Sequence, residues 1–199
     1  MLPDLAAIAR VRLARPGGEL GRGVAFHHAC DAVFHASDWF CDRSRALRIR
    51  LTADGVDDGP ARACAHAGLE MLLDGALVAD PRVAGQTRRA FGALAPPSDV
   101  LGDLAPPDTR DAWRATLGRI GTALDPKRYA DPRFIAERLL GMTAGRRRIE
   151  LRAAHVDRVA DALAAFAPVV VPVAAGVVAS VRAAALADHA ASESLALPA

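Results

Sequence analysis

A chain of 199 residues is long enough to bury a substantial core, and one domain is the expectation at this length. Hydrophobic residues make up 52% of the chain but aromatic residues only 5%, which favours close-packed helices over sheets. The formal net charge of +2 is too small to indicate a nucleic-acid-binding surface. Cys30, Cys41 and Cys64 form no CxxC pair and no secretory signal is visible, so we expect a reduced, cytoplasmic protein.

The first half of the chain alternates apolar stretches with turns. Turns are predicted where glycine and proline cluster, at residues 16–18, 54–60 and 80–81. Pro60 stands close to the start of the longest apolar stretch, a position where a helix tolerates proline. Helices are therefore predicted over residues 1–13, 19–40, 43–53, 61–79 and 82–94.

The second half shows the same alternation. Two proline pairs, at 96–97 and 106–107, make residues 95–108 the most loop-like stretch. No alternating strand pattern, internal repeat or glycine-rich phosphate loop occurs. We expect an all-α protein with a single domain over 1–190 and a frayed tail over 191–199. Further helices are predicted over residues 108–124, 132–141 and 147–166 and in the apolar segment that follows.

Residues 162–181 carry no charged side chain and are long enough to span a bilayer. The run consists mostly of alanine and valine, however, and it includes Pro168 and Pro172. A weakly hydrophobic run with two prolines favours a helix, a break and a second helix packed inside a soluble core. We therefore expect no membrane span.

Metal-capable side chains recur at helical spacing within residues 25–38. His27, Asp31 and His35 are spaced i, i+4, i+8, which stacks them along one side of a helix. At about 100° per residue, His28 falls within the same arc of about 100°. The pattern predicts a polar stripe on this helix.

A second stripe of the same spacing consists of His66, Glu70 and Asp74. These are the only polar side chains in residues 63–79. One interpretation is the solvent face of an amphipathic helix. The stripe is narrow and holds no lysine, arginine or glutamine, which favours a mostly buried helix whose polar groups need partners, because unpaired buried charges are costly.

Two facing helices with such stripes predict a metal site. Imidazole and carboxylate are the usual ligands of zinc, manganese and iron, and a bound divalent ion makes hydroxide available near neutral pH. Asp31 and Asp74 are the expected inward-facing carboxylates, with Asp31 also catalytic. A spare histidine, His28 or His35, is the expected general acid or base. The predicted metal ligands are His27, Asp31, His66, Glu70 and Asp74.

The order of these residues resembles the acyl carrier protein phosphodiesterase family, whose all-helical members are similar to HD-domain metal phosphohydrolases. The family opens with an apolar stretch ending in an aspartate, and Asp4 matches it as an additional candidate ligand. A histidine four residues before an aspartate follows, as in His27 and Asp31. Two acidic residues four apart on a later helix match Glu70 and Asp74.

The resemblance extends further along the chain. Residues 134–148 are similar to a family helix that ends in glycine–methionine and a basic pair, and residues 166–168 to an aromatic-rich helix ending near a proline. The chain departs from the family at Gly75, where the family has a histidine. Family members also carry an earlier segment with its own histidine, so we expect either that such a segment precedes Met1 or that the site lacks one ligand.

The resemblance implies an HD-domain-like orthogonal helical bundle and a hydrolase, namely a phosphodiesterase that uses a divalent metal such as manganese. It implies a phosphoester substrate, with holo acyl carrier protein as the partner that loses 4′-phosphopantetheine. Arg146, Arg147 and Arg148 form a basic cluster expected to contact a phosphate or an acidic partner. The alternative for that cluster is a solvated helix end.

Two other functions stay open. A non-catalytic helical binding or scaffold protein would keep the fold without the activity, which the shortened start and Gly75 favour. A carboxylate-bridged di-iron oxidase also lines facing helices with glutamate and histidine, although it normally needs more glutamates than these stripes offer.

Overall fold

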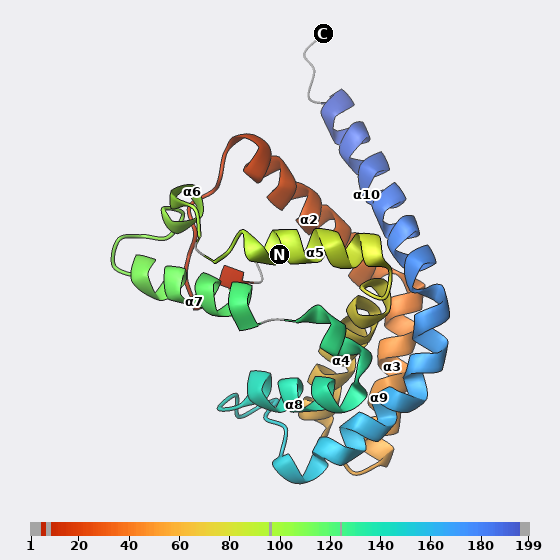
Figure 1. Ribbon diagram of the computed structural model, residues 1–199. Helices are drawn as coiled ribbons and strands as arrows, with labels where there is room; N and C mark the ends of the chain where they lie inside the picture. The colour runs from red at the N-terminus through yellow and green to blue at the C-terminus, as the bar shows by residue number, and fades with distance from the viewer. Residues whose placement is uncertain (1–4, 7–8, 96, 124, 196–199) are drawn as a thin grey trace. The chain divides into compact units, whose positions relative to one another are not determined.

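The computed structural model describes residues 5–6, 9–95, 97–123 and 125–195. Within them the regular elements are helical and no strand occurs, which confirms the predicted all-α class (Figure 1). The α-helices are α2 (Gly18–Ala36), α3 (Asp38–Ala53), α4 (Asp58–Leu77), α5 (Pro81–Gly92), α6 (Asp99–Gly102), α7 (Arg110–Ala123), α8 (Pro132–Thr143), α9 (Val156–Val170) and α10 (Ala174–Leu195). The 3₁₀ helices are η1 (Pro126–Ala130), η2 (Ala153–His155) and η3 (Val171–Val173).

The chain divides into two compact units. The first unit comprises residues 1–33, 85–125 and 181–199, and the second unit comprises residues 34–84 and 126–180. The single domain over 1–190 and its HD-like arrangement stay predictions. In the predicted frayed tail, α10 continues to Leu195, and residues 196–199 lie outside the described part of the chain.

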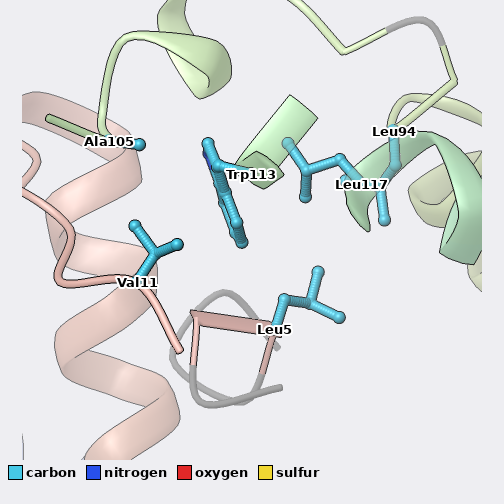
Figure 2. Packing of buried hydrophobic residues seen from close by; sticks show 6 residues of the cluster. All are labelled: Leu5, Val11, Leu94, Ala105, Trp113 and Leu117. Atoms are coloured by element: carbon cyan, nitrogen blue, oxygen red, sulfur yellow. The ribbon is translucent and has the colours of Figure 1, made fainter. Parts of the chain in front are cut away.

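The first unit has its own apolar core around Trp113 (Figure 2). The Trp113 side chain is fully buried, and its Nε1–H donates to the Leu101 carbonyl oxygen at 2.8 Å. The one polar group of the indole is therefore satisfied inside the core. The buried residues of this cluster come from the N-terminal segment, the α5–α7 connection and α7: Leu5, Val11, Leu94, Ala105, Trp113 and Leu117.

Helix α4 is central to the second unit, where it contacts α3, α8, α9 and η1. Half of its 20 residues are buried, and the apolar ones recur at helical spacing, which fixes one broad face inward. Gly68 permits close packing on that face, because a Cβ there would lie 3.0 Å from Cδ2 of Leu163. Burying a leucine such as Leu69 contributes about 1.5–3 kcal/mol. The position of the polar edge of α4 is thus set by its core contacts.

Of the helix predicted over residues 1–13, residues 1–4 and 7–8 lie outside the described part of the chain, and the described residues are no longer helical from Arg10 onward. Arg10 has a φ of 54°, in the left-handed region, and the Val11 N–H donates to the Ala6 carbonyl oxygen at 3.0 Å. This hydrogen bond is typical of a helix that closes at a left-handed residue. The chain is then non-helical through Gly17.

Two further boundaries differ from the prediction. The helix predicted over 19–40 is divided at Ser37, whose extended backbone separates α2 from α3. Helix α9 begins at Val156 rather than near residue 147. The Leu151 N–H donates to Oγ1 of Thr143 at 3.1 Å, which holds the chain in a turn where a continuing helix was expected.

The charge-free run 162–181 forms the end of α9, η3 and the start of α10. Pro168 lies inside α9 and Pro172 in η3, and the backbone stays helical from α9 through η3 into α10, so the predicted break is reduced to one 3₁₀ turn. The predicted packing inside a core is found for only part of the run. Val170 is fully buried, whereas Val169 and Val171 are 44% and 52% exposed. Among the described residues, Ala153–Ala187 is the one helix long and apolar enough to cross a membrane, with 22% of its apolar window buried. Length and composition alone do not separate such a helix from one in a soluble core.

Candidate metal centre

Three side chains of the second unit, His35, His66 and Glu70, converge on one carboxylate oxygen. Oε1 of Glu70 lies 2.7 Å from Nε2 of His35 and 3.1 Å from Nε2 of His66. The potential ligand atoms of the three residues all lie within 4.8 Å of one another. We call this group the His-His-Glu cluster. It joins one residue from the end of α2 to two residues one turn apart on α4.

The sequence of α4 explains why His66 and Glu70 share an edge. The helix contains no β-branched residue and is rich in alanine and leucine, which have high helix propensity. Residues four apart in such a helix lie on the same side. Pro60 occurs in the first turn, where its missing N–H leaves no helical hydrogen bond unmade. The opposite side of α4 is held by the core.

Ser37 brings the third ligand into reach. Its hydroxyl donates to the Phe34 carbonyl oxygen at 2.6 Å and accepts from the Phe40 N–H at 3.3 Å. The residue therefore caps the start of α3 immediately after α2 ends. His35 lies in the last turn of α2, two residues before this cap, so the turn at Ser37 fixes where its imidazole points.

The Phe40 ring contacts both imidazoles of the cluster. It is buried, and its ring centroid lies 4.8 Å from that of His35 and 5.0 Å from that of His66. The contact with His66 is edge-to-face, with an interplanar angle of 89°. The two imidazole centroids are 4.7 Å apart. Aromatic contacts of this kind limit ring rotation and hold both Nε2 atoms towards Glu70.

The His-His-Glu cluster is half-exposed rather than interior. The side chains of His35, Glu70 and His66 are 30%, 36% and 48% exposed. The inference that α4 is mostly buried is right for its apolar face, but the expectation that its polar stripe turns into the interior is wrong. His66 and Asp74 are on the exposed side of α4, as the solvent-face interpretation predicts.

The pKa of the Glu70 carboxyl is held below its ordinary value. Partial burial by itself raises this pKa, because it disfavours the charged form. Hydrogen bonds from His66 and His35, together with the charge that these imidazoles carry when protonated, outweigh burial and lower it. Glu70 is thus an ionised carboxylate near neutral pH, which is the form that binds a cation.

The donor set fits a divalent metal ion. Two imidazoles and one carboxylate are three protein ligands of the kind that bind catalytic zinc and other first-row metals. Ligands about 2.1 Å from a tetrahedral ion lie about 3.4 Å apart. The contacts at Glu70 are 2.7 and 3.1 Å while the group extends up to 4.8 Å, so the three ligand atoms need to shift by on the order of 1 Å to surround an ion.

The other predicted site residues lie elsewhere. Asp74 is exposed, one turn beyond Glu70 on α4, and does not belong to the His-His-Glu cluster. His27, His28 and Asp31 belong to the first unit; His28 and Asp31 are exposed and His27 is half-buried. Their predicted roles stay predictions. Asp4 lies outside the described residues.

Gly75, where the similar family has a histidine, is buried against η1. A Cβ at this position would clash with the carbonyl group of Tyr129 and would lie 2.8 Å from the Ala130 nitrogen. The backbone of η1 therefore occupies the space that a side chain would need. Gly75 is thus a packing requirement of the second unit.

Sequence reasoning missed the supporting residues Ser37 and Phe40. A serine followed by an acidic residue is a signal for the start of a helix. Ser37-Asp38 is such a pair, but it lies inside residues 19–40, which the sequence predicts as one continuous helix. No sequence signal places Phe40 under both imidazoles, because that contact depends on how α3 packs on α4. A comparison with protein-family models, curated proteins and solved structures gives no match for this chain.

Proposed function

We propose that the His-His-Glu cluster binds a divalent metal ion and that the protein is a metal-dependent phosphohydrolase acting on a phosphodiester. The observation that carries the proposal is the convergence of two imidazole Nε2 atoms on a single Glu70 oxygen. A hydrogen-bonded pair of residues is common on helical surfaces, but three potential ligands from two helices within 4.8 Å are a donor set that a metal ion needs.

The accessibility of the cluster is more typical of a catalytic metal site than of a structural one. Three protein ligands leave at least one coordination position for water or substrate, whereas structural zinc sites are closed by four. All three side chains are partly exposed, so a substrate can reach them. A bound divalent ion at this position would polarise a phosphoryl oxygen and supply a nucleophilic hydroxide.

The residues of the cluster have separate tasks in this proposal. Glu70 supplies the negative charge and accepts hydrogen bonds from both imidazoles when no ion is present. His35 and His66 can bind the ion only through an unprotonated Nε2, so ion binding is weaker at acid pH. Phe40 orients both rings and excludes water from one side of them.

The choice of a phosphodiester rests on the sequence resemblance described above. The order of the histidine and acidic residues is similar to that of acyl carrier protein phosphodiesterases, which makes holo acyl carrier protein the proposed partner. Manganese, zinc and iron are the candidate ions, since each accepts imidazole and carboxylate ligands.

Metal titration and turnover of a generic diester test the proposal together. The protein is purified, treated with chelator, and titrated with Mn²⁺ or Zn²⁺ before assay with bis(4-nitrophenyl) phosphate. We expect Glu70→Gln to reduce turnover by about 100-fold or more, because it removes the charged ligand. The matched control is Glu137→Gln on α8, an exposed glutamate paired with Arg133 at 3.2 Å. A protein that binds no ion, or equal activity in both variants, contradicts the proposal.

A non-catalytic binding protein is the second candidate, and Gly75 favours it. The backbone of η1 closes the position where the similar family carries a further polar group. A chain with an intact fold and a reduced ligand set would bind partners without turnover. Metal binding with no hydrolysis of the diester or of holo acyl carrier protein would select this candidate.

A further inference from the structure

A second polar site lies at the other end of α4, between its first turn and the loop joining α8 to α9. The two segments line an open pocket of about 600 Å³. Three arginines line it, Arg147, Arg148 and Arg152, and we call it the basic pocket. Its volume falls within the range of small-molecule sites, about 300–1,000 Å³.

The loop that carries these arginines is held in one conformation. Thr143 is buried, and its Oγ1 donates to the Leu139 carbonyl oxygen at 2.8 Å while accepting from the Leu151 N–H at 3.1 Å. Gly145 has a φ of +70°, which lets the chain reverse directly after α8. The backbone that presents the arginines is therefore fixed at both ends of the turn.

The acidic residues of the basic pocket already have partners. The Asp57 carboxylate pairs with Arg152 at 2.7 Å, and the Glu150 carboxylate accepts from the Gly145 N–H at 3.2 Å. Among the described residues, Arg147 and Arg148 form no ion pair. Both are exposed, and the pocket lining, with three arginines against Asp57 and Glu150, carries a formal net charge of +1.

The remaining walls are mixed. Pro60, Leu140 and Leu151 add apolar groups to the lining of the basic pocket. The first turn of α4 lines it as well, and the N-terminus of a helix carries a partial positive charge that favours anions. A ligand that fits these walls has an anionic head and an apolar body.

We propose that the basic pocket binds a small organic phosphate, with the phosphate group on Arg147 and Arg148 and the organic body against Pro60 and Leu140. Guanidinium groups match the geometry of phosphate oxygens and bind them with paired hydrogen bonds. The site is separate from the His-His-Glu cluster, because Gly59 and His66 are about 10 Å apart along the axis of α4. The proposal therefore does not depend on metal binding.

Calorimetric titration with phenyl phosphate tests the proposal on full-length protein kept metal-free with chelator. We expect saturable binding by the wild type, weaker binding of inorganic phosphate, and no binding of phenol. The double variant Arg147→Ala/Arg148→Ala should weaken phenyl phosphate binding by about 10-fold or more, since each guanidinium supplies charge-assisted hydrogen bonds. Thermal melts of both proteins should coincide, because both side chains are exposed.

Arg146 provides the matched control, because it is equally charged and exposed but does not line the pocket. Arg146→Ala should bind phenyl phosphate within about twofold of the wild type, and Glu70→Gln should bind it unchanged. Amide chemical-shift changes in the wild type should centre on residues 146–153. Absence of binding at about 10 mM ligand, or equal losses in Arg146→Ala and the double variant, would overturn the proposal.

Discussion

Two helices of this chain carry the same polar spacing, yet only one of them has a buried face. His27, Asp31 and His35 follow the i, i+4, i+8 pattern on α2, and α4 repeats it from His66 to Asp74. Half of the α4 residues are buried, whereas no α2 residue is. Spacing decides which side chains share an edge, but burial of the opposite face decides how firmly that edge is held.

Removing a core side chain from α4 should change the free energy of unfolding far more than removing a side chain from α2, and this is the largest effect that we expect. We expect Leu69→Ala to lower the free energy of unfolding by about 2–5 kcal/mol, because Leu69 is fully buried and its loss leaves a cavity. Val24→Ala on α2 removes a half-buried side chain and should cost less than about 1 kcal/mol. Urea denaturation measures both values. Equal losses in the two variants would show that the helices do not differ as described.

Removing one candidate ligand from the α4 stripe and one from the α2 stripe compares how much each helix contributes to metal affinity. Glu70→Gln should weaken Zn²⁺ or Mn²⁺ affinity by about 100-fold, since it removes the charged member of the His-His-Glu cluster. Asp31→Ala should weaken it by less than about 10-fold, because the three clustered donors converge without Asp31. Competition titration with a fluorescent chelator reports both affinities. A larger loss for Asp31→Ala would move the site to the α2 stripe.

The contact between α4 and η1 can be broken at a single glycine. Gly75→Ala should lower the free energy of unfolding by about 1–3 kcal/mol, because the new methyl group would clash with the Tyr129 carbonyl. Gly141→Ala in α8 is the matched control, since nothing lies within 4 Å of a Cβ there. That variant should be stabilised by about 0.5–1 kcal/mol, as alanine favours helix. Stabilisation of both variants would rule out the described packing of η1.

The Ser37 cap offers a smaller perturbation that reaches the His-His-Glu cluster indirectly. Ser37→Ala should lower the free energy of unfolding by about 1 kcal/mol and weaken metal affinity severalfold, because His35 is positioned by this turn. Ser98→Ala removes the cap of α6 in the first unit and should leave metal affinity unchanged. Threonine at position 37 should restore affinity. If both alanine variants bind the ion as tightly as the wild type, Ser37 has no positioning role.

The lowered pKa of Glu70 predicts a small dependence of stability on pH. A carboxyl whose pKa is lower in the folded state stabilises the protein above its ordinary value of 4.5, and the contribution is lost as pH falls through the lowered pKa. The stability difference between wild type and Glu70→Gln should therefore be largest above pH 4.5 and shrink below it. Denaturation of metal-free protein at several pH values measures it. A difference that grows on acidification has the wrong sign.

The helical class and most helix positions were predictable because they depend on local composition. Glycine and proline clusters mark the turns, and the spacing of alanine and leucine marks the helices between them. The failures occur where one side-chain hydrogen bond decides the backbone. The hydroxyl of Ser37 divides a predicted helix, and that of Thr143 delays the start of α9. The Ser37 bonds are local and left a signal in the sequence, whereas the bond from the Leu151 N–H to Thr143 depends on a turn that helical periodicity does not reveal.

The candidate site was predictable in its residue types but not in its grouping. The pattern on α4 includes His66 and Glu70, which the structure brings together with His35, yet the same pattern gives Asp74 equal weight. His35 joins them because α2 ends one residue before Ser37, a boundary that periodicity does not reveal. Contact with Phe40 likewise depends on the packing of α3 against α4. Contacts between helices of this kind cannot be predicted from the spacing of residues along one helix.

X-ray absorption of the zinc-loaded protein tests the metal site most directly. The account predicts one bound ion with two imidazole nitrogens and a carboxylate oxygen at about 2.0–2.2 Å, and loss of the bound ion in Glu70→Gln. A spectrum with only oxygen scatterers, or no ion retained after gel filtration, would contradict the assignment of His35, His66 and Glu70 as its ligands.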